Sequence, residues 1–202
     1  SEKIAGILSG MGFTPAQQKE EADLVLFNTC CVRENAENKL FGNVGKLKQW
    51  KQQDPRRMVG VCGCMMQQPG AAERLAEMFP FVDLIFGTTN MQFLPQMLRE
   101  VLVERHRSLH IDPDGAAEEE VAMLRTPPPL ASVNIMQGCD NFCTYCIVPY
   151  VRGREHSRPL DSVAREVEAL LAQGYREVML LGQNVNSYGK GLEGADFAKL
   201  LD

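Results

Sequence analysis

The fold class is decided by residues 24–30, Leu-Val-Leu-Phe-Asn-Thr-Cys. A short, continuous apolar run of this kind is typical of a buried parallel strand. Similar short runs lie at 59–61 and 84–86, and helical patterns cover 2–11, 34–52, roughly 70–78 and 91–105. Strands that alternate with helices predict a parallel sheet covered by helices. We therefore expect a three-layer α/β domain over residues 1–106.

The segment 107–130 differs in composition from its surroundings. It is acidic and rich in alanine, and it ends near three consecutive prolines, 127–129, which favour an extended spacer. We predict that it links two domains. The whole chain of 202 residues has a net charge of -5, so no overall basic field indicates nucleic acid. Because part of that charge lies in this segment, the acidity is weak evidence against an RNA substrate.

A second domain is predicted over 131–202. A strand at 131–137, a helix at 160–173 and a strand at 177–181 form the first β/α units of a barrel. Two such units cannot close a barrel, so we expect the protein to continue beyond Asp202. The helical pattern that starts at Ser1, without a methionine, leads to the same expectation for the N-terminus.

Three cysteines follow the strand at 131–137 with the spacing C-x3-C-x2-C. They are Cys139, Cys143 and Cys146. Structural zinc sites and ferredoxin-type clusters use four ligands. A loop with three thiolates therefore indicates an iron–sulfur cluster with one iron open to another molecule. A non-catalytic zinc or iron–sulfur binding module is the alternative from a different functional class.

The other four cysteines lie in the first domain. Cys30 and Cys64 each come just after a predicted strand, and parallel strands end at one edge of a sheet. The two are expected to meet there, although buried apolar packing is an equally good explanation. Nothing in the pattern assigns Cys31 or Cys62. An odd total of seven cysteines, with neither a signal peptide nor a long apolar span, argues against a secreted disulfide scaffold and predicts a cytoplasmic, non-membrane protein.

At these cysteines the sequence resembles the radical S-adenosylmethionine (SAM) methylthiotransferase family. Tyr145 fits the aromatic position before the third cysteine. Further matching blocks are Asn28-Thr29-Cys30 with Val32-Arg33-Glu34, Gly63-Cys64 with Gln67, residues 137–159 and residues 180–189. The last two blocks are similar to the branch of the family that modifies tRNA. The resemblance covers the whole chain apart from the linker.

The resemblance implies two [4Fe-4S] clusters and S-adenosyl-L-methionine. Cys139, Cys143 and Cys146 would hold the cluster that binds this cofactor and delivers the electron that yields a 5′-deoxyadenosyl radical. Cys30 and Cys64 match two of three ligands of an auxiliary cluster, and the third is expected upstream of Ser1. No catalytic residues are expected beyond the cluster ligands.

The implied reaction adds a methylthio group to carbon 2 of isopentenyl-adenosine next to the tRNA anticodon. That C–H is far too weakly acidic for a general base, so radical chemistry carried by cofactors is needed. Alternatives within the family act on ribosomal protein S12 or on threonylcarbamoyl-adenosine tRNA. The expected partners are the tRNA anticodon loop and a reductant protein of the flavodoxin or ferredoxin type, and the protein is expected to be a monomer.

Other candidate site residues lie beside the three-cysteine loop and after the strand at 177–181. Gln183 and Asn184 are expected to bind the cofactor, together with Tyr145, although turn formation also explains an Asn-rich loop. Arg152 and Arg154 are candidates for substrate binding, since arginine grips carboxylates and phosphates. The alternative is a solvated loop.

Overall fold

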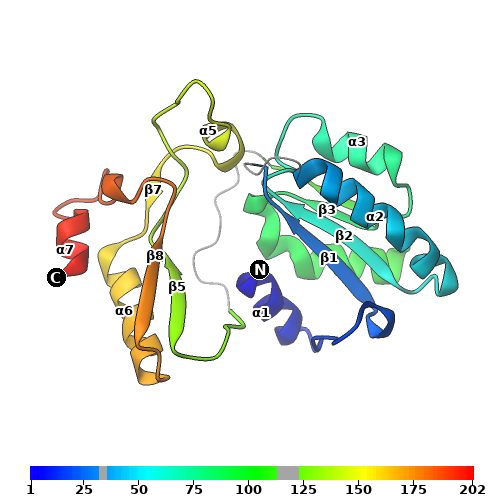
Figure 1. The fold of residues 1–202 in the computed structure, drawn as a ribbon, viewed down its shortest axis with the longest axis horizontal. Helices are drawn as coiled ribbons and strands as arrows, with labels where there is room; N and C mark the ends of the chain where they lie inside the picture. The colour runs from blue at the N-terminus through cyan, green and yellow to red at the C-terminus, as the bar shows by residue number, and fades with distance from the viewer. Residues whose placement is uncertain (32–35, 113–122) are drawn as a thin grey trace. The chain divides into compact units, whose positions relative to one another are not determined.

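The computed structural model describes residues 1–31, 36–112 and 123–202. The motif residues Val32, Arg33 and Glu34 lie outside this range, as does the middle of the predicted linker. The chain divides into two compact units. Unit 1 comprises Ser1 and residues 3–123, and unit 2 comprises residues 124–202 together with Glu2. The break at Met123 falls within the segment predicted to be a linker. Both units are mixed α/β and contain parallel strand pairs (Figure 1).

Unit 1 is built on a parallel sheet of four strands in the order β1-β2-β3-β4. They are β1 (Leu24–Thr29), β2 (Met58–Gly63), β3 (Leu84–Phe86) and β4 (Ser108–His110). Strand β4 falls inside segment 107–130, so the prediction that the linker starts at 107 was wrong. The alternation of Ser108, Leu109 and His110 is too short and too polar to be recognised as a strand from the pattern alone.

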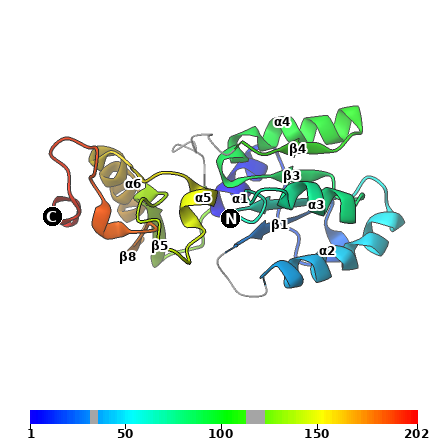
Figure 2. The same ribbon diagram turned by 90° about the horizontal axis from the view of Figure 1, so that it is seen from above.

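Helices cover both faces of this sheet, as the view in Figure 2 shows. On one face α2 (Ala36–Gln53) and α3 (Ala71–Met78) pack over residues such as Val59 and Val61. On the other face α1 (Glu2–Gly10) and α4 (Leu94–Arg99) pack over residues such as Met58 and Cys62. Because side chains alternate along a strand, the central strand β2 supplies both cores and is buried throughout. The predicted three-layer domain is confirmed.

Two details of unit 1 differ from the sequence-based expectation. The run at 24–27 was expected to be fully buried, but β1 stands at one end of the described sheet and those residues are half-buried. The predicted helix at 91–105 is three elements: a 3-10 helix (Thr88–Phe93), α4, and a π-helical turn (Glu100–Glu104). The apolar periodicity marks the buried face of α4 but does not show the change in helix type.

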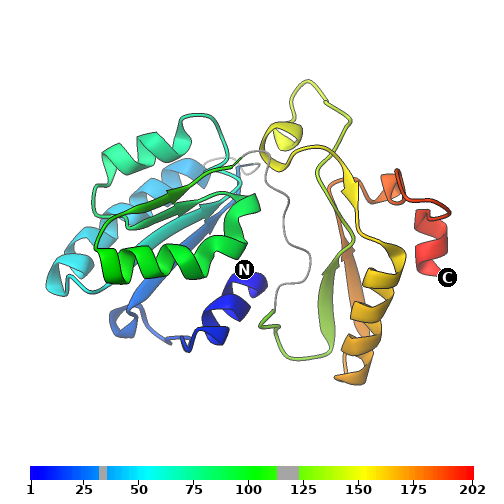
Figure 3. The ribbon, with the colours of Figure 1, turned by 180° about the vertical axis from the view of Figure 1, so that it is seen from behind.

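Unit 2 begins with β5 (Leu130–Asn134), which pairs in parallel with β8 (Glu177–Leu181). Helix α6 (Leu160–Ala172) lies between them in the chain and covers one side of the pair (Figure 3). Its Val163 and Leu170 pack into their core. The single strand predicted at 131–137 is interrupted. Met136–Gln137 form β6, which pairs antiparallel with β7 (His156–Ser157). This β/α arrangement is consistent with a partial radical-SAM barrel.

Three short helical elements complete unit 2. They are α5 (Val148–Arg152), a 3-10 helix (Val185–Ser187) and α7 (Phe197–Leu201). None of the helices in the described parts of the chain has both the length and the apolar character needed to cross a membrane.

Candidate functional site

The three-cysteine loop begins with a glycine that no other residue can replace without distortion. Gly138 follows β6 with a φ of +74°, and a Cβ there would lie 2.0 Å from the carbonyl oxygen of Arg154. The Cys139 amide donates to the Gly153 carbonyl at 3.3 Å. The loop therefore starts in close backbone contact with the segment that leads into β7.

Side-chain contacts hold the same two segments together. The Asp140 carboxylate accepts a hydrogen bond from the Glu155 amide at 3.0 Å, and its Oδ1 lies 3.0 Å from Nε of Arg154. Arg154 also lies over the Phe142 ring, 5.7 Å from its centroid. Within the loop, the Cys146 amide donates to the Cys143 carbonyl at 2.9 Å, which forms a turn. The backbone of the cysteine loop is thus ordered by local contacts.

The three cysteines of this loop differ in exposure. Cys139 is buried, Cys146 is half-buried and Cys143 is exposed, and none is in a disulfide. Three free thiols within one loop are the donor set that an iron–sulfur cluster with an open iron requires. Among the residues that the structure describes, no three His, Cys, Asp or Glu side chains are grouped closely enough to hold a metal ion. The donor chemistry therefore fits a cluster, while the side chains are not gathered around one centre.

Three cysteines of unit 1, Cys30, Cys31 and Cys64, lie at the carboxyl ends of β1 and β2. The thiols of Cys31 and Cys64 are hydrogen-bonded to each other, and Cys30 is close enough to Cys31 to interact electrostatically. Cys64 also donates to the Thr29 carbonyl, with 3.7 Å between sulfur and oxygen. The sequence predicted that two loops would meet at this edge but left Cys31 unassigned. Its position directly after Cys30 was the available signal.

Burial and neighbouring thiols raise the pKa of two cysteines of unit 1, Cys31 and Cys62. The hydrogen bond with Cys64, followed by burial, raises the pKa of the Cys31 thiol well above its ordinary value. Burial raises the pKa of the Cys62 thiol to about 12. Cys62 lies within the apolar core under α1 and α4, which explains its burial as packing. The sequence had assigned no role to Cys62, and the structure makes it a core residue.

Gly63 stands before Cys64 as Gly138 stands before Cys139. Its φ is +104°, and a Cβ there would lie 2.3 Å from the Thr29 carbonyl oxygen. Both cysteine regions thus depend on a glycine that lets one strand end pass against neighbouring backbone.

The two amide residues after β8 behave differently from each other. Asn184 donates from Nδ2 to the Ser187 hydroxyl, and so forms part of the loop. Gln183 has a buried Oε1 atom without a hydrogen-bond partner in the described residues. Asn184 therefore fits the turn explanation, whereas Gln183 has an acceptor available for a ligand.

The arginines near the loop also separate into two groups. Arg154 is exposed and paired with Asp140. Arg152 is the last residue of α5 and interacts with another group of the protein. Arg158, in contrast, donates to the Asn134 carbonyl at 2.7 Å and to Glu166 at 2.6 Å. Arg158 therefore joins β5, β7 and α6 and acts in the fold.

Tyr145 is 90% exposed, so it contributes little to packing. Gln67, which belongs to the resemblance in unit 1, is buried and donates from Nε2 to the Asp112 carbonyl at 3.0 Å. It therefore holds the chain just after β4 against the end of β2. The structure gives Gln67 a clear role in the fold.

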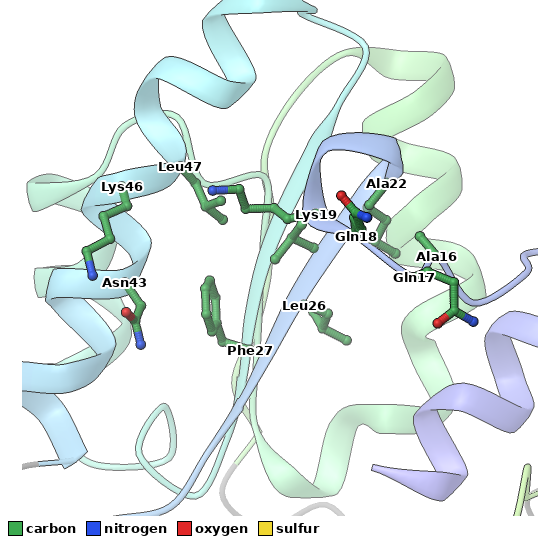
Figure 4. A pocket seen from close by; sticks show the side chains of 12 residues that line it. Ala16, Gln17, Gln18, Lys19, Ala22, Leu26, Phe27, Asn43, Lys46 and Leu47 are labelled. Atoms are coloured by element: carbon green, nitrogen blue, oxygen red, sulfur yellow. The ribbon is translucent and has the colours of Figure 1, made fainter.

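A groove of about 490 Å³ lies elsewhere in unit 1, between β1, helix α2 and the segment before β1. Lys19, Asn43 and Lys46 line it together with Phe27 and Leu47 (Figure 4). No cysteine is among the lining residues, so the groove is separate from the cysteine region. Lys46 is exposed, so this part of α2 faces solvent.

Comparison with known families agrees with this division of the chain. Residues 1–87 match the uncharacterized protein family UPF0004, and residues 133–202 match the radical SAM superfamily. We refer to these two matched stretches as the UPF0004 segment and the radical SAM segment. The radical SAM segment begins in β5 and contains the three-cysteine loop, and the UPF0004 segment contains Cys30, Cys31, Cys62 and Cys64.

Curated relatives match the whole chain. A protein of Clostridium perfringens named tRNA-2-methylthio-N(6)-dimethylallyladenosine synthase is 53% identical over 100% of this chain and 45% of the relative. A protein of Pelotomaculum thermopropionicum with the same name is 52% identical over 100% of this chain and 46% of the relative. The chain thus spans less than half the length of these relatives. The predicted resemblance to the methylthiotransferases is confirmed.

One solved structure supports the fold. The radical S-adenosylmethionine methyltransferase TsrM from Kitasatospora setae aligns with 98% of this chain and 42% of that chain, with a TM-score of 0.58. The sequence identity is 17%, so the likeness concerns the fold alone.

Proposed function

We propose that the protein containing this chain is a radical SAM methylthiotransferase that adds a methylthio group to carbon 2 of isopentenyl-adenosine next to the tRNA anticodon. The observation that carries the proposal is the identity of 50–53% over the whole chain to curated enzymes of that name. The radical SAM family implies a [4Fe-4S] cluster and S-adenosylmethionine.

In this proposal Cys139, Cys143 and Cys146 hold the radical SAM cluster. When bound, the cluster supplies the electron that cleaves a carbon–sulfur bond of S-adenosylmethionine. The contacts of Gly138 and Asp140 with the segment before β7 hold the loop in place, which supports the proposal. Among the cofactor-binding candidates, the unpartnered oxygen of Gln183 favours that residue, and Tyr145 is accessible.

Cys30 and Cys64 would ligate an auxiliary cluster in unit 1. Their strand ends lie side by side, since Thr29 is opposite Gly63 in the register of β1 and β2. This second cluster is the source that we propose for the transferred sulfur. Cys31 lies within the same group of thiols and is available as a further ligand of this cluster.

The proposed substrate is the anticodon loop of a tRNA, with Arg152 and Arg154 as phosphate contacts. The target adenine would leave its stack to reach the cofactors. We also propose a flavodoxin- or ferredoxin-type reductant, a monomeric state and a cytoplasmic location.

Anaerobic reconstitution of the protein with iron and sulfide, followed by dithionite and S-adenosylmethionine, tests the proposal. We expect 5′-deoxyadenosine and methionine, and 2-methylthio-isopentenyl-adenosine in tRNA nucleosides measured by mass spectrometry. Loss of that nucleoside in a deletion strain would establish the substrate.

Other results would assign a different function. In a deletion strain, normal tRNA nucleosides together with unmodified ribosomal protein S12 would place the protein in one other branch. Loss of the methylthio group from threonylcarbamoyl-adenosine, with 2-methylthio-isopentenyl-adenosine still present, would place it in another. Tetrahedral zinc with no visible absorption, and no 5′-deoxyadenosine, would indicate a non-catalytic metal-binding module.

A further inference from the structure

Glu155, directly before β7, has a buried carboxylate. Its side chain is 3% exposed. Neither carboxylate oxygen has a hydrogen-bond partner among the described residues. The Lys190 ammonium lies 3.3 Å from Oε1, but without the directional geometry of a hydrogen bond, and the lysine side chain is 66% exposed.

This arrangement leaves most of the carboxylate unsatisfied. An ionised carboxylate offers about four acceptor positions across two oxygens. Burying such a group is unfavourable unless donors or opposite charges compensate it. One largely solvated lysine compensates a single oxygen and leaves Oε2 without a donor. A ligand with several hydrogen-bond donors and a positive charge would satisfy the remainder.

Backbone contacts place Glu155 at the cysteine loop. Its amide donates to Asp140, and the preceding Arg154 carbonyl is the atom that excludes a Cβ at Gly138. Strands β6 and β7 are antiparallel, and His156 is opposite Gln137. One residue further in the same register, Glu155 lies opposite Gly138, directly before the first cysteine. It is therefore fixed beside the start of the loop.

The segment after β8 reaches the same pair of short strands. A Cβ at Gly182 would lie 2.5 Å from Cγ of Met136 in β6, so the chain leaves β8 directly beside β6. At the far end of that segment, the Gly189 amide donates to the Ser157 hydroxyl in β7 at 3.0 Å. Between these two anchors lies Gln183, whose buried Oε1 also lacks a partner.

We propose that the Glu155 carboxylate is a further binding residue for S-adenosylmethionine and that it accepts hydrogen bonds from the cofactor alongside the Gln183 amide oxygen. The inference rests on the proposed function, because it adds a residue to that site. The cofactor offers the N–H groups of its α-amino group, two ribose hydroxyls and a positive sulfonium. All of these complement a buried anion at the carboxyl end of parallel strands, where ligands bind in this type of fold. No bond is made or broken at Glu155.

Equilibrium binding of S-adenosylmethionine to the anaerobically reconstituted protein, without reductant so that no turnover occurs, tests the inference. Glu155→Gln keeps the shape and removes the charge. We expect its dissociation constant to rise about tenfold or more, as for the loss of hydrogen bonds to a charged group. Glu168→Gln, an exposed glutamate on α6, is the matched control and should bind like wild type. Equal affinity of Glu155→Gln and wild type would overturn the inference.

Lys190→Ala separates ligand binding from a purely structural ion pair. If Glu155 binds the cofactor, removing its lysine partner leaves affinity unchanged or improves it. If the pair acts only in the fold, both variants will lower the melting temperature and the affinity alike, and that outcome also overturns the inference. If Glu155→Gln fails to fold, Glu155→Asp, which keeps the charge but retracts it, should still show weakened binding.

Competition with fragments of the cofactor identifies the donor. 5′-Methylthioadenosine carries the ribose hydroxyls without the amino-acid end, and methionine carries the ammonium without the ribose. The fragment that binds Glu155→Gln more weakly than wild type contains the group from which Glu155 accepts a hydrogen bond. If the substitution weakens binding of neither fragment and leaves S-adenosylmethionine affinity unchanged, the inference is contradicted. If wild type itself binds no S-adenosylmethionine, the proposed function fails, whereas a failure confined to Glu155→Gln leaves it standing.

Discussion

The loop that starts at Gly138 carries its cysteines on one short stretch of chain, whereas Cys31 and Cys64 meet from the ends of two strands that are distant in sequence. The first group is graded from buried Cys139 to exposed Cys143, and the second is half-buried or buried. A local loop can therefore present a thiol to solvent while its backbone stays fixed. Cysteines that are brought together by the ends of paired strands are covered by the neighbouring strands and loops, and so are at least half-buried.

The two regions share one construction. In each, a glycine with positive φ lets the cysteine-bearing backbone pass within contact of a neighbouring carbonyl. Glycine is needed there for two reasons, the left-handed conformation and the lack of room for a Cβ. The difference lies in which neighbour is contacted. In unit 1 it is the adjacent parallel strand, and in unit 2 it is the segment just before β7, which pairs antiparallel with β6.

The largest expected effect separates the two regions by chemistry. Cys143→Ala should reduce 5′-deoxyadenosine formation to background, because it removes a ligand of the radical SAM cluster. Cys64→Ala should keep 5′-deoxyadenosine formation but lose the methylthio product. Chromatography of 5′-deoxyadenosine and mass spectrometry of tRNA nucleosides measure the two yields. Equal behaviour of the two variants would show that the cysteine regions do not have separate roles.

The next effect concerns the two glycines. Gly138→Ala should lower the free energy of unfolding by about 2 kcal/mol or more, because it adds an overlap with the Arg154 carbonyl to the left-handed strain. Gly174→Ala is the matched control in unit 2, with a φ of +92° and nothing within 4 Å, and should cost about 1 kcal/mol from backbone strain alone. Urea denaturation measures both values.

The same pair of substitutions can be made in unit 1. Gly63→Ala should be clearly more destabilising than Gly70→Ala, whose φ is +74° in open space. The ordering follows from the Thr29 carbonyl that a Cβ at Gly63 would overlap. If Gly63→Ala and Gly70→Ala cost the same in urea denaturation, the close approach of β1 and β2 at this edge is not as described.

A smaller effect is expected in thiol reactivity. In the cluster-free folded protein at about pH 8, exposed Cys143 should be alkylated by iodoacetamide first, and buried Cys62 last. Because the thiolate is the reactive form and burial raises the Cys62 pKa to about 12, its rate should keep rising with pH across the alkaline range. Peptide mapping by mass spectrometry gives the order. In urea the difference should disappear, and persistence there would exclude burial as its cause.

The smallest effect is expected at Tyr145. Because its side chain is 90% exposed, Tyr145→Ala should change the free energy of unfolding by no more than about 0.5 kcal/mol. A larger loss in thermal or urea denaturation would mean that the exposed end of the loop contributes to packing. A loss of S-adenosylmethionine affinity without a loss of stability would instead support the cofactor contact proposed for this residue.

Particular strands show which parts of the fold the local sequence pattern predicts and which it does not. Strands β3 and β8 have the bounds predicted for them, because a short apolar run between turn residues is specified by its own composition. Strand β4 was missed because its stability comes from pairing with β3 rather than from its own residues. The break between β5 and β6 was missed for a similar reason, since only the returning β7 gives residues 136–137 a separate partner.

The sequence by itself determined the α/β class, the two sets of cysteines and the relation to the methylthiotransferases, because apolar runs and cysteine spacing are local properties of the chain. Only the tertiary structure decided that Cys31 contacts Cys64, that Cys62 belongs to the core, that Asn184 is used by its own turn and that Glu155 is buried without sufficient donors. Apart from the Asn184 turn, which is made with Ser187 three residues along the chain, each of these depends on a neighbour that is distant in sequence. Burial and hydrogen bonding of that kind exist only once the strands have paired.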